Sequence, residues 1–154
     1  MAKEIERKFL VLKKPWKTTD RKVKCWQGYL AFDPVTVRVR TMGPKAFLTI
    51  KGRTKGFTRD EFEFPIPLKQ ANELLTSLCG RPVEKVRHYV KHKGHLWEVD
   101  EFQGDNKGLI IAEIELISER EKFDRPAWLG NEVTDDHRYY NSHLSKHPYK
   151  GWDK

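Results

Sequence analysis

The sequence is poor in the features that mark several large protein classes. Only two cysteines, Cys25 and Cys79, occur in 154 residues, and their spacing matches neither a metal-binding nor a redox motif. Free thiols of this kind are typical of a reducing compartment, so we expect a cytoplasmic protein. No apolar run exceeds four residues, and the start of the chain lacks the apolar core of a secretory signal. We therefore expect neither a membrane span nor a signal peptide.

Internal repeats and low-complexity tracts are also absent, whereas charge is abundant. Charged residues make up 34% of the chain, and 30 Lys and Arg against 22 Asp and Glu give a formal net charge of +8. This excess favours an anionic partner such as nucleic acid, a membrane surface or a polyphosphate. The length of 154 residues predicts a single domain.

Alternation of apolar with polar residues predicts a mainly β (α+β) protein. We expect eight strands, near Ile5–Leu12, Val23–Ala31, Val35–Thr41, Ala46–Lys51, Thr58–Ile66, Val83–Lys93, His95–Phe102 and Leu109–Ile117. Helical spacing of apolar residues from Leu68 to Leu78, followed by Gly80, predicts one helix. A second, short helix is expected from about Thr134 to Leu144.

Charged residues recur at positions i and i+2 of the expected strands, which places them on one face of each strand. The charged faces are Glu4, Glu6 and Lys8; Arg38 and Arg40; Thr49 and Lys51; Glu61 and Glu63; Lys85 and Arg87; Glu98 and Asp100; and Glu113 and Glu115. A solvated sheet face would explain any one of these strands. It does not explain why some strands carry only acids and others only bases.

A closed barrel with these faces inward accounts for the whole set. Two carboxylates at i and i+2 lie about 7 Å apart and repel by roughly 2 kcal/mol at an effective dielectric constant of about 20. Acid clusters bind hard cations through oxygen, and clustered Arg and Lys bind phosphate oxygens. The pattern therefore predicts an enclosed site for a metal-bound phosphate compound.

The opening Glu4-Ile5-Glu6-Arg7-Lys8 resembles the ExExK signature of the triphosphate tunnel metalloenzymes, also called CYTH domains. The resemblance to the inorganic triphosphatase-like branch spans residues 3–144 and continues through several further motifs. These are Gln27-Gly28-Tyr29-Leu30, Val37-Arg38-Val39-Arg40, Leu48-Thr49-Ile50-Lys51-Gly52, Arg59-Asp60-Glu61-Phe62-Glu63, Val83-Glu84-Lys85-Val86-Arg87, Glu98-Val99-Asp100, Glu113-Ile114-Glu115, Glu132-Val133-Thr134-Asp135 and Arg138-Tyr139-Tyr140-Asn141. The tail 145–154 has no counterpart and is given no role.

The resemblance implies an eight-stranded antiparallel closed β-barrel with a few flanking helices and a metal-dependent hydrolysis of a triphosphate. By the same resemblance the metal ligands are Glu4, Glu6, Glu113 and Glu115. Glu63 and Asp100 would position water or a second metal, and Lys85 would orient the attacking water. The phosphate-binding residues implied are Lys8, Arg38, Arg40, Lys51, Arg87 and Arg138. Mg²⁺ is the expected metal, and Mn²⁺ suits the same carboxylate oxygens.

Several alternatives stay open on the same sequence. Related tunnels act as class IV adenylate cyclases, thiamine triphosphatases or nucleoside triphosphatases. Cyclase-like members carry a His-Phe pair upstream of ExExK, and only three residues precede Glu4 here, so we expect hydrolysis. A non-enzymatic binder of polyphosphate or nucleic acid is a further alternative, because bases alternate with aromatics from Lys13 to Trp26. No RNA-binding signature accompanies that segment, so nucleic acid is not the expected partner.

Histidines at positions 88, 92 and 95 invite a zinc-site hypothesis. His95 faces away from the other two on a strand, so we expect solvated histidines there instead. The expected partner is thus a small anionic substrate, with no membrane partner. The oligomeric state is not encoded in any pattern described above.

Overall fold

The computed structural model describes residues 3–153, which form nine strands and two α-helices. The strands are β1 (Lys3–Val11), β2 (Lys22–Ala31), β3 (Thr36–Met42), β4 (Lys45–Lys51), β5 (Thr58–Pro65), β6 (Val83–His92), β7 (His95–Phe102), β8 (Ile110–Glu115) and β9 (Leu129–Glu132). The helices are α1 (Leu68–Ser77) and α2 (Asn141–Lys146). Short 3₁₀ turns cover Gly104–Asn106, His137–Tyr139 and Tyr149–Gly151.

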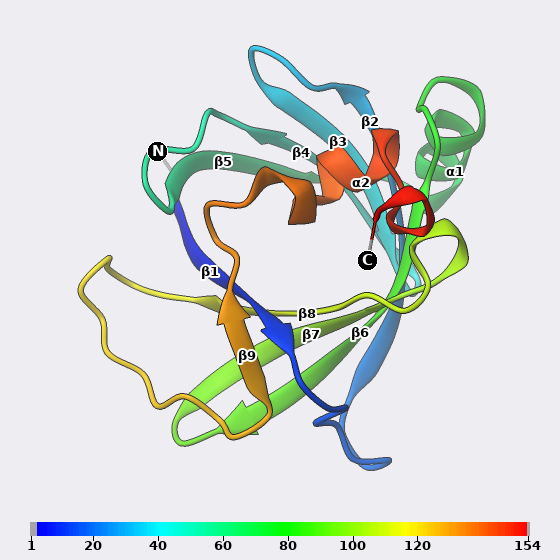
Figure 1. Cartoon of the computed structure of the whole chain (residues 1–154). Coiled ribbons are helices and arrows are strands. Elements are labelled where there is room, and N and C mark those ends of the chain that lie inside the picture. Colours follow the sequence, from blue (N-terminus) through cyan, green and yellow to red (C-terminus); the bar gives the residue numbers. More distant parts are fainter. Residues whose placement is uncertain (1–2, 154) are drawn as a thin grey trace.

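Eight of these strands close into an antiparallel barrel, as the sequence predicted (Figure 1). The strand order is β5-β4-β3-β2-β6-β7-β8-β1, and β5 pairs again with β1. Closure depends on β1, whose Lys3 lies opposite Asp60 of β5 while its Glu6 lies opposite Glu115 of β8. Both neighbours of β1 are distant in sequence, so the ring forms only when the two ends of the sheet meet.

Three differences from the sequence prediction go beyond small shifts in strand ends or bear on the site. Strand β9 pairs with β1 beside Phe9 and was not expected, because its four residues show no alternation of apolar and polar side chains. Strand β8 ends at Glu115 rather than at Ile117. The second helix is shorter than expected, because a 3₁₀ turn at His137–Tyr139 precedes the start of α2 at Asn141.

The barrel carries much of its apolar surface on the outside, because its inward faces are charged. One apolar cluster lies on the outer faces of β1, β7 and β8, where Phe9 and Trp97 are fully buried. Aromatic side chains of the segment 116–129 cover it: the Phe123 and Trp128 rings lie 5.7 and 5.6 Å from the Trp97 ring, both edge to face. Burial of these large rings supplies packing that a charged interior cannot give.

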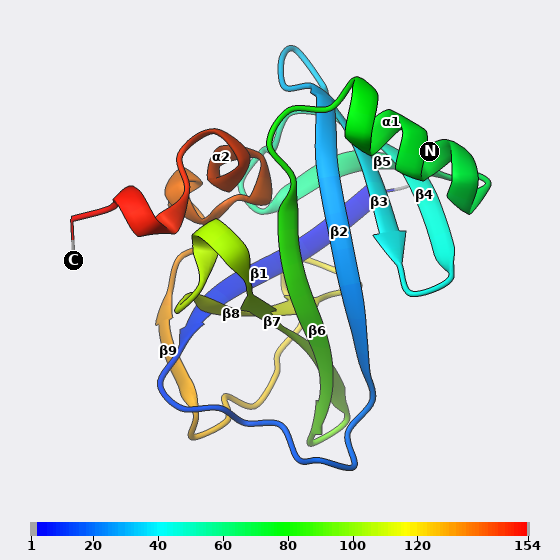
Figure 2. The same cartoon turned by 90° about the vertical axis from the view of Figure 1, so that its right-hand side faces the viewer.

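Helix α1 covers the outer faces of β2, β3 and β4 (Figure 2). Its buried residues Ala71 and Leu75 pack against Val39 of β3 and Ala46 of β4. The end of the helix approaches β2 so closely that a Cβ atom added to Gly28 would lie 2.7 Å from Cys79 Cβ. Glycine at this position is therefore required by the packing of α1 on the sheet.

One end of the barrel interior is filled by an apolar cluster. Val83, Phe102 and Ile111 lie on the inward faces of β6, β7 and β8, and Leu144 of α2 is fully buried against them. Trp152 of the tail also packs on this cluster. The tail, to which the sequence assigned no role, packs on the barrel through Tyr149 and Trp152. No helix within residues 3–153 is long and apolar enough to cross a membrane.

Candidate active site in the barrel interior

The inward faces of the strands enclose a cavity of about 180 Å³. Its wall consists of Glu4, Glu6, Lys8, Tyr29, Thr36, Arg38, Arg40, Lys51, Arg59, Glu61, Glu63, Lys85, Arg87, Glu98, Glu113, Glu115, Tyr140, Asn141 and Ser142. Fourteen of these nineteen side chains are charged. The acid-only and base-only faces of the sequence thus meet around one space, as their alternation predicted.

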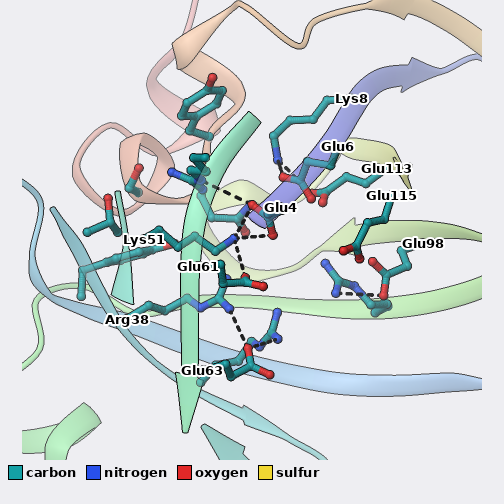
Figure 3. A pocket seen from close by; sticks show the side chains of 18 of the residues that line it. Glu4, Glu6, Lys8, Arg38, Lys51, Glu61, Glu63, Glu98, Glu113 and Glu115 are labelled. Carbon is teal, nitrogen blue, oxygen red and sulfur yellow. Dashed lines mark hydrogen bonds and ion pairs between the residues drawn. The ribbon is translucent and has the colours of Figure 1, made fainter. Parts of the chain in front are cut away.

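Carboxylates gather where β1, β7 and β8 run side by side (Figure 3). The register places Glu6 opposite Glu115, and Glu98 opposite Glu113. Glu4 lies on the same face of β1, and Glu61 of β5 lines the cavity beside it. All four carboxylates that the sequence assigned to metal binding therefore share the cavity wall.

Glu4 is held by cations in this structure. Lys51 Nζ donates hydrogen bonds to Glu4 Oε1 and Oε2 at 3.0 and 2.9 Å, and Arg59 Nε donates to Oε1 at 3.3 Å. Burial alone would raise the pKa of Glu4, but the charge and hydrogen bonds of Lys51, together with the charge of Arg59, lower it to about 2. Glu4 is therefore ionised at neutral pH.

Glu6 has the opposite character. Burial and the charge of nearby Glu113 raise the pKa of Glu6 to about 7, although Lys8 acts against them. Lys8 Nζ lies 3.0 Å from Glu113 Oε1 and 3.3 Å from Glu6 Oε1. Burial raises the pKa of Glu115 too, and the charges of Glu4 and Glu98 add to that effect. The acidic side thus holds more negative charge than its cations neutralise.

The basic side presents donors that lack acceptors. Arg38 and Arg40 each approach Glu63 only at 3.7 Å, and the buried Nε atoms of both arginines have no hydrogen-bond partner. Burial, followed by the charges of Arg38 and Arg87, lowers the pKa of Arg40 to about 10. Buried donors without partners are costly, and a bound anion would satisfy them. Glu63 itself lies at the margin of this group and accepts a hydrogen bond from Thr49 Oγ1 at 3.1 Å.

Asp100 is placed differently from the sequence expectation. It is fully buried and does not line the cavity. Its Oδ2 lies 2.8 Å from Lys85 Nζ, and its two oxygens accept bonds of 2.8 and 3.0 Å from Arg87. Burial alone would raise its pKa, but the charges of Arg87 and Lys85 lower it. Asp100 therefore lies beneath the cavity wall, where it holds the side chains of Lys85 and Arg87 in position and does not face a metal or water in the cavity.

Arg138 is not brought to the cavity. Its side chain is 60% exposed, and its guanidinium binds Asp136 at 2.7 Å on the outer surface. The 3₁₀ turn at His137–Tyr139 explains the difference, because it directs this side chain away from the barrel while Asn141, three residues later, lines the wall. The expected phosphate contact of Arg138 therefore has no support in this structure.

The histidines of β6 and β7 differ in part from the solvated set that the sequence predicted. His88 is buried, and its ring stacks on Trp16 with centroids 3.7 Å apart. Its Nε2 lies 3.3 Å from Glu101. The segment 13–26 thus uses one of its aromatics for packing, which removes a ring that nucleic-acid bases could stack on.

Some residues of the cavity wall were absent from the candidate set. Glu61 and Glu98 lay on faces recognised as charged, and their role follows once the strand register is known. Tyr29, Thr36, Arg59, Tyr140, Asn141 and Ser142 had no assigned role in substrate or metal binding. Arg59 continues the charged face of Glu61 and Glu63 on β5 and could have been recognised by its spacing. The others are uncharged, so alternation of charge does not identify them.

The carboxylates fit a hard divalent cation by their chemistry. They offer only oxygen donors, and the raised pKa values of Glu6 and Glu115 show that burial and neighbouring acids oppose their ionisation. Within residues 3–153, no three His, Cys, Asp or Glu side chains are grouped closely enough to hold a metal as they stand. Lys51 pairs with Glu4, and Lys8 pairs with both Glu6 and Glu113, so a bound cation would replace these ammonium contacts.

The fold and the cavity define a class: a closed antiparallel barrel whose interior brings carboxylates and basic side chains together around one cavity. Residues 2–148 match the family model described as the CYTH domain. The chain is 49% identical to an inorganic triphosphatase of Acetivibrio thermocellus over 154 residues, 99% of each chain. It is 40% identical to an inorganic triphosphatase of Nitrosomonas europaea over 147 residues, 92% of this chain and 96% of that one.

A crystal structure of an inorganic triphosphatase is also similar. It has a TM-score of 0.69 and 39% sequence identity, and the match covers 92% of this chain and 97% of that one. The chain belongs to the CYTH domain family. Membership in this family of tunnel metalloenzymes implies a metal-dependent activity.

Proposed function

We propose that this protein hydrolyses inorganic tripolyphosphate to pyrophosphate and orthophosphate, with Mg²⁺ as its metal. It is then a hydrolase acting on phosphoanhydride bonds. The observation that carries this proposal is the division of one enclosed wall into a carboxylate side and a guanidinium side with unpaired buried donors. The relatives described above as inorganic triphosphatases support it.

Cavity size favours an unsubstituted phosphate chain. A volume of about 180 Å³ lies below the roughly 300–1,000 Å³ of pockets that hold drug-sized ligands. A nucleoside also needs apolar wall for its base, and the only aromatic rings in the wall are those of Tyr29 and Tyr140. Adenylate cyclase, thiamine triphosphatase and nucleoside triphosphatase activities are therefore less well supported than tripolyphosphatase activity.

The basic side would hold the substrate. We assign the phosphate contacts to Lys8, Arg38, Arg40, Lys51 and Arg87, all of which line the cavity. Fixed cations stabilise the charge that develops on non-bridging oxygens during phosphoryl transfer, and positioning does most of the remaining work. Water attacks a terminal phosphorus, the bond from that phosphorus to the bridging oxygen breaks, and pyrophosphate leaves.

The acidic side would hold the metal through Glu4, Glu6, Glu113 and Glu115. When bound, Mg²⁺ supplies positive charge to the phosphate oxygens and so lowers the barrier to attack. Mn²⁺ accepts the same oxygen donors. We place Lys85 near the attacking water, because its ammonium lies in the cavity wall between Asp100 and Asn141. We assign to Glu63, which also lines the cavity, the role of accepting a hydrogen bond from that water.

The two free thiols, Cys25 and Cys79, are consistent with a cytoplasmic address. We propose that the chain acts there as one CYTH domain on a small anionic substrate.

The test is orthophosphate release from tripolyphosphate with Mg²⁺ and with Mn²⁺, for the wild type and for Glu4→Ala and Glu6→Ala. Both variants should lose at least about 100-fold in rate, since each removes a charge-bearing oxygen ligand. Glu73→Ala is the matched control, because Glu73 is an exposed glutamate on α1 far from the cavity wall. Rates like the wild type in both wall variants would remove the metal assignment. Cyclic AMP formation from ATP would favour the cyclase alternative.

A further inference from the structure

Asn141 links the C-terminal segment to the cavity. It is the first residue of α2, it lines the cavity wall, and its Oδ1 accepts a hydrogen bond of 3.0 Å from Lys85 Nζ. We propose that Asn141 is a positioning residue for the hydrolysis, which holds the Lys85 ammonium in the orientation that serves the reacting phosphate. The inference rests on the proposed function.

The hydrogen-bond capacity of Lys85 supports this role. A lysine ammonium has three N–H donors and no acceptor. Asp100 Oδ2 at 2.8 Å and Asn141 Oδ1 at 3.0 Å take two of them. The Lys85 side chain is only 1% exposed, so its third donor is left for an oxygen inside the cavity. Two fixed acceptors therefore determine where the third N–H points.

Asp100 alone cannot set this orientation. It is immobilised by Arg87, which donates to both of its oxygens, and it provides a single contact to Lys85. An ammonium on a flexible four-carbon chain can rotate about one contact. The second contact from Asn141 removes that freedom, and it comes from an element outside the barrel strands.

Packing fixes the position of α2 independently of the cavity. Leu144 is fully buried in the apolar cluster at the barrel end, and Ser145 Oγ donates a hydrogen bond of 2.8 Å to the Arg81 carbonyl. Lys146 Nζ lies 3.9 Å from the centre of the Phe32 ring. These contacts hold the helix that presents Asn141. The C-terminal segment, with Tyr140, Asn141 and Ser142, thus completes a site whose remaining residues come from strands.

The experiment compares Asn141→Leu, which keeps side-chain size but loses the acceptor, with Asn141→Asp, which keeps it. Asn141→Leu should lower kcat for tripolyphosphate by about 10- to 100-fold, the effect of losing one hydrogen bond to a charged group, with KM within about threefold. Asn141→Asp should retain kcat within about threefold and raise KM, because its new negative charge repels the substrate.

Two controls separate positioning from stability. Leu75→Ala weakens the packing of α1 on the outer faces of the sheet without touching the cavity wall, and it should lower Tm and leave kcat unchanged. In a Lys85→Met background, Asn141→Leu should have no further effect on kcat, because a residue that acts through Lys85 has nothing left to position. NMR of ¹⁵N-labelled lysine gives a readout without turnover: Asn141→Leu should broaden the Lys85 Nζ signal, whereas Leu75→Ala should not.

The inference is overturned if Asn141→Leu turns over like the wild type, if both Asn141 variants lower kcat equally, or if the loss persists fully without Lys85. A wild type that releases no orthophosphate from tripolyphosphate would instead refute the proposed function. In that case the Lys85 signal still tests whether Asn141 holds the ammonium.

Discussion

Replacing Asp100 with alanine should destabilise the fold strongly, because Asp100 is an anchor beneath the cavity wall. The substitution leaves Lys85 and Arg87 buried without their main counter-ion. Breaking a buried pair in this way costs roughly 3–5 kcal/mol. We expect the lower end, about 3 kcal/mol, because Lys85 keeps its hydrogen bond to Asn141 and Arg87 keeps its ion pair with Glu98.

Urea unfolding at pH 7 measures this loss, and a decrease in Tm of about 6–12 °C should accompany it in a chain of this size. Glu98→Ala is the matched control on the same strand. Glu98 pairs with Arg87 at 3.3 Å but is 30% exposed, so its loss should cost less than about 1 kcal/mol.

The pH dependence gives a second check on Asp100. Its pKa in the folded state is lowered, so its contribution to stability is present above the unfolded-state pKa and disappears as the pH falls through the folded value. The stability difference between wild type and Asp100→Ala should therefore be constant from pH 5 to 7 and shrink below about pH 4. A deficit below 1 kcal/mol at pH 7, or one that does not narrow in acid, would refute the anchoring role.

Three further predictions follow from separate features. Arg138→Ala should change kcat and KM for tripolyphosphate by less than about twofold, since this side chain binds Asp136 outside the cavity. A large rise in KM would show that Arg138 contacts the substrate. Gly28→Ala should lower the free energy of unfolding by about 1–3 kcal/mol, measured in urea, because the new Cβ meets Cys79 at 2.7 Å. Metal-free protein should lose stability as the pH rises from 5 to 8. The reason is that the pKa of Glu6 is about 7 in the folded state, whereas the unfolded state releases this proton near pH 4.5. Glu6→Gln should make the Tm measured in thermal melts less dependent on pH over this range.

The parts of the molecule that follow from alternation were predictable from the sequence. Period-two patterns identified the eight barrel strands and their charged faces, and closure of the barrel then brought those faces around one cavity. Strand β9 was not predicted because its four residues are too few to show a period of two. Alternation also does not predict that Asp100 is buried beneath the cavity wall, since its position depends on the contacts that it makes with Arg87 and Lys85.

The C-terminal segment shows a second limit of sequence reasoning. Arg138 and Asn141 stand in one motif, and charge alone made Arg138 the natural choice for a phosphate contact. In the structure the 3₁₀ turn at His137–Tyr139 and the hydrogen bonds to the Asp136 carboxylate direct the Arg138 side chain away from the cavity. Neither the turn nor the hydrogen bond between Asn141 and Lys85 has a periodic signal.

The way β1 closes the ring makes function inseparable from complete folding. Glu4 and Glu6 sit on a strand whose partners lie about fifty and one hundred residues further along the chain, as the pairings of Lys3 with Asp60 and of Glu6 with Glu115 show. Contacts so distant in sequence form late, because the loops that join them must first be closed. No fragment that lacks either partner strand assembles the carboxylate wall, so a half-made chain yields no weakly active intermediate.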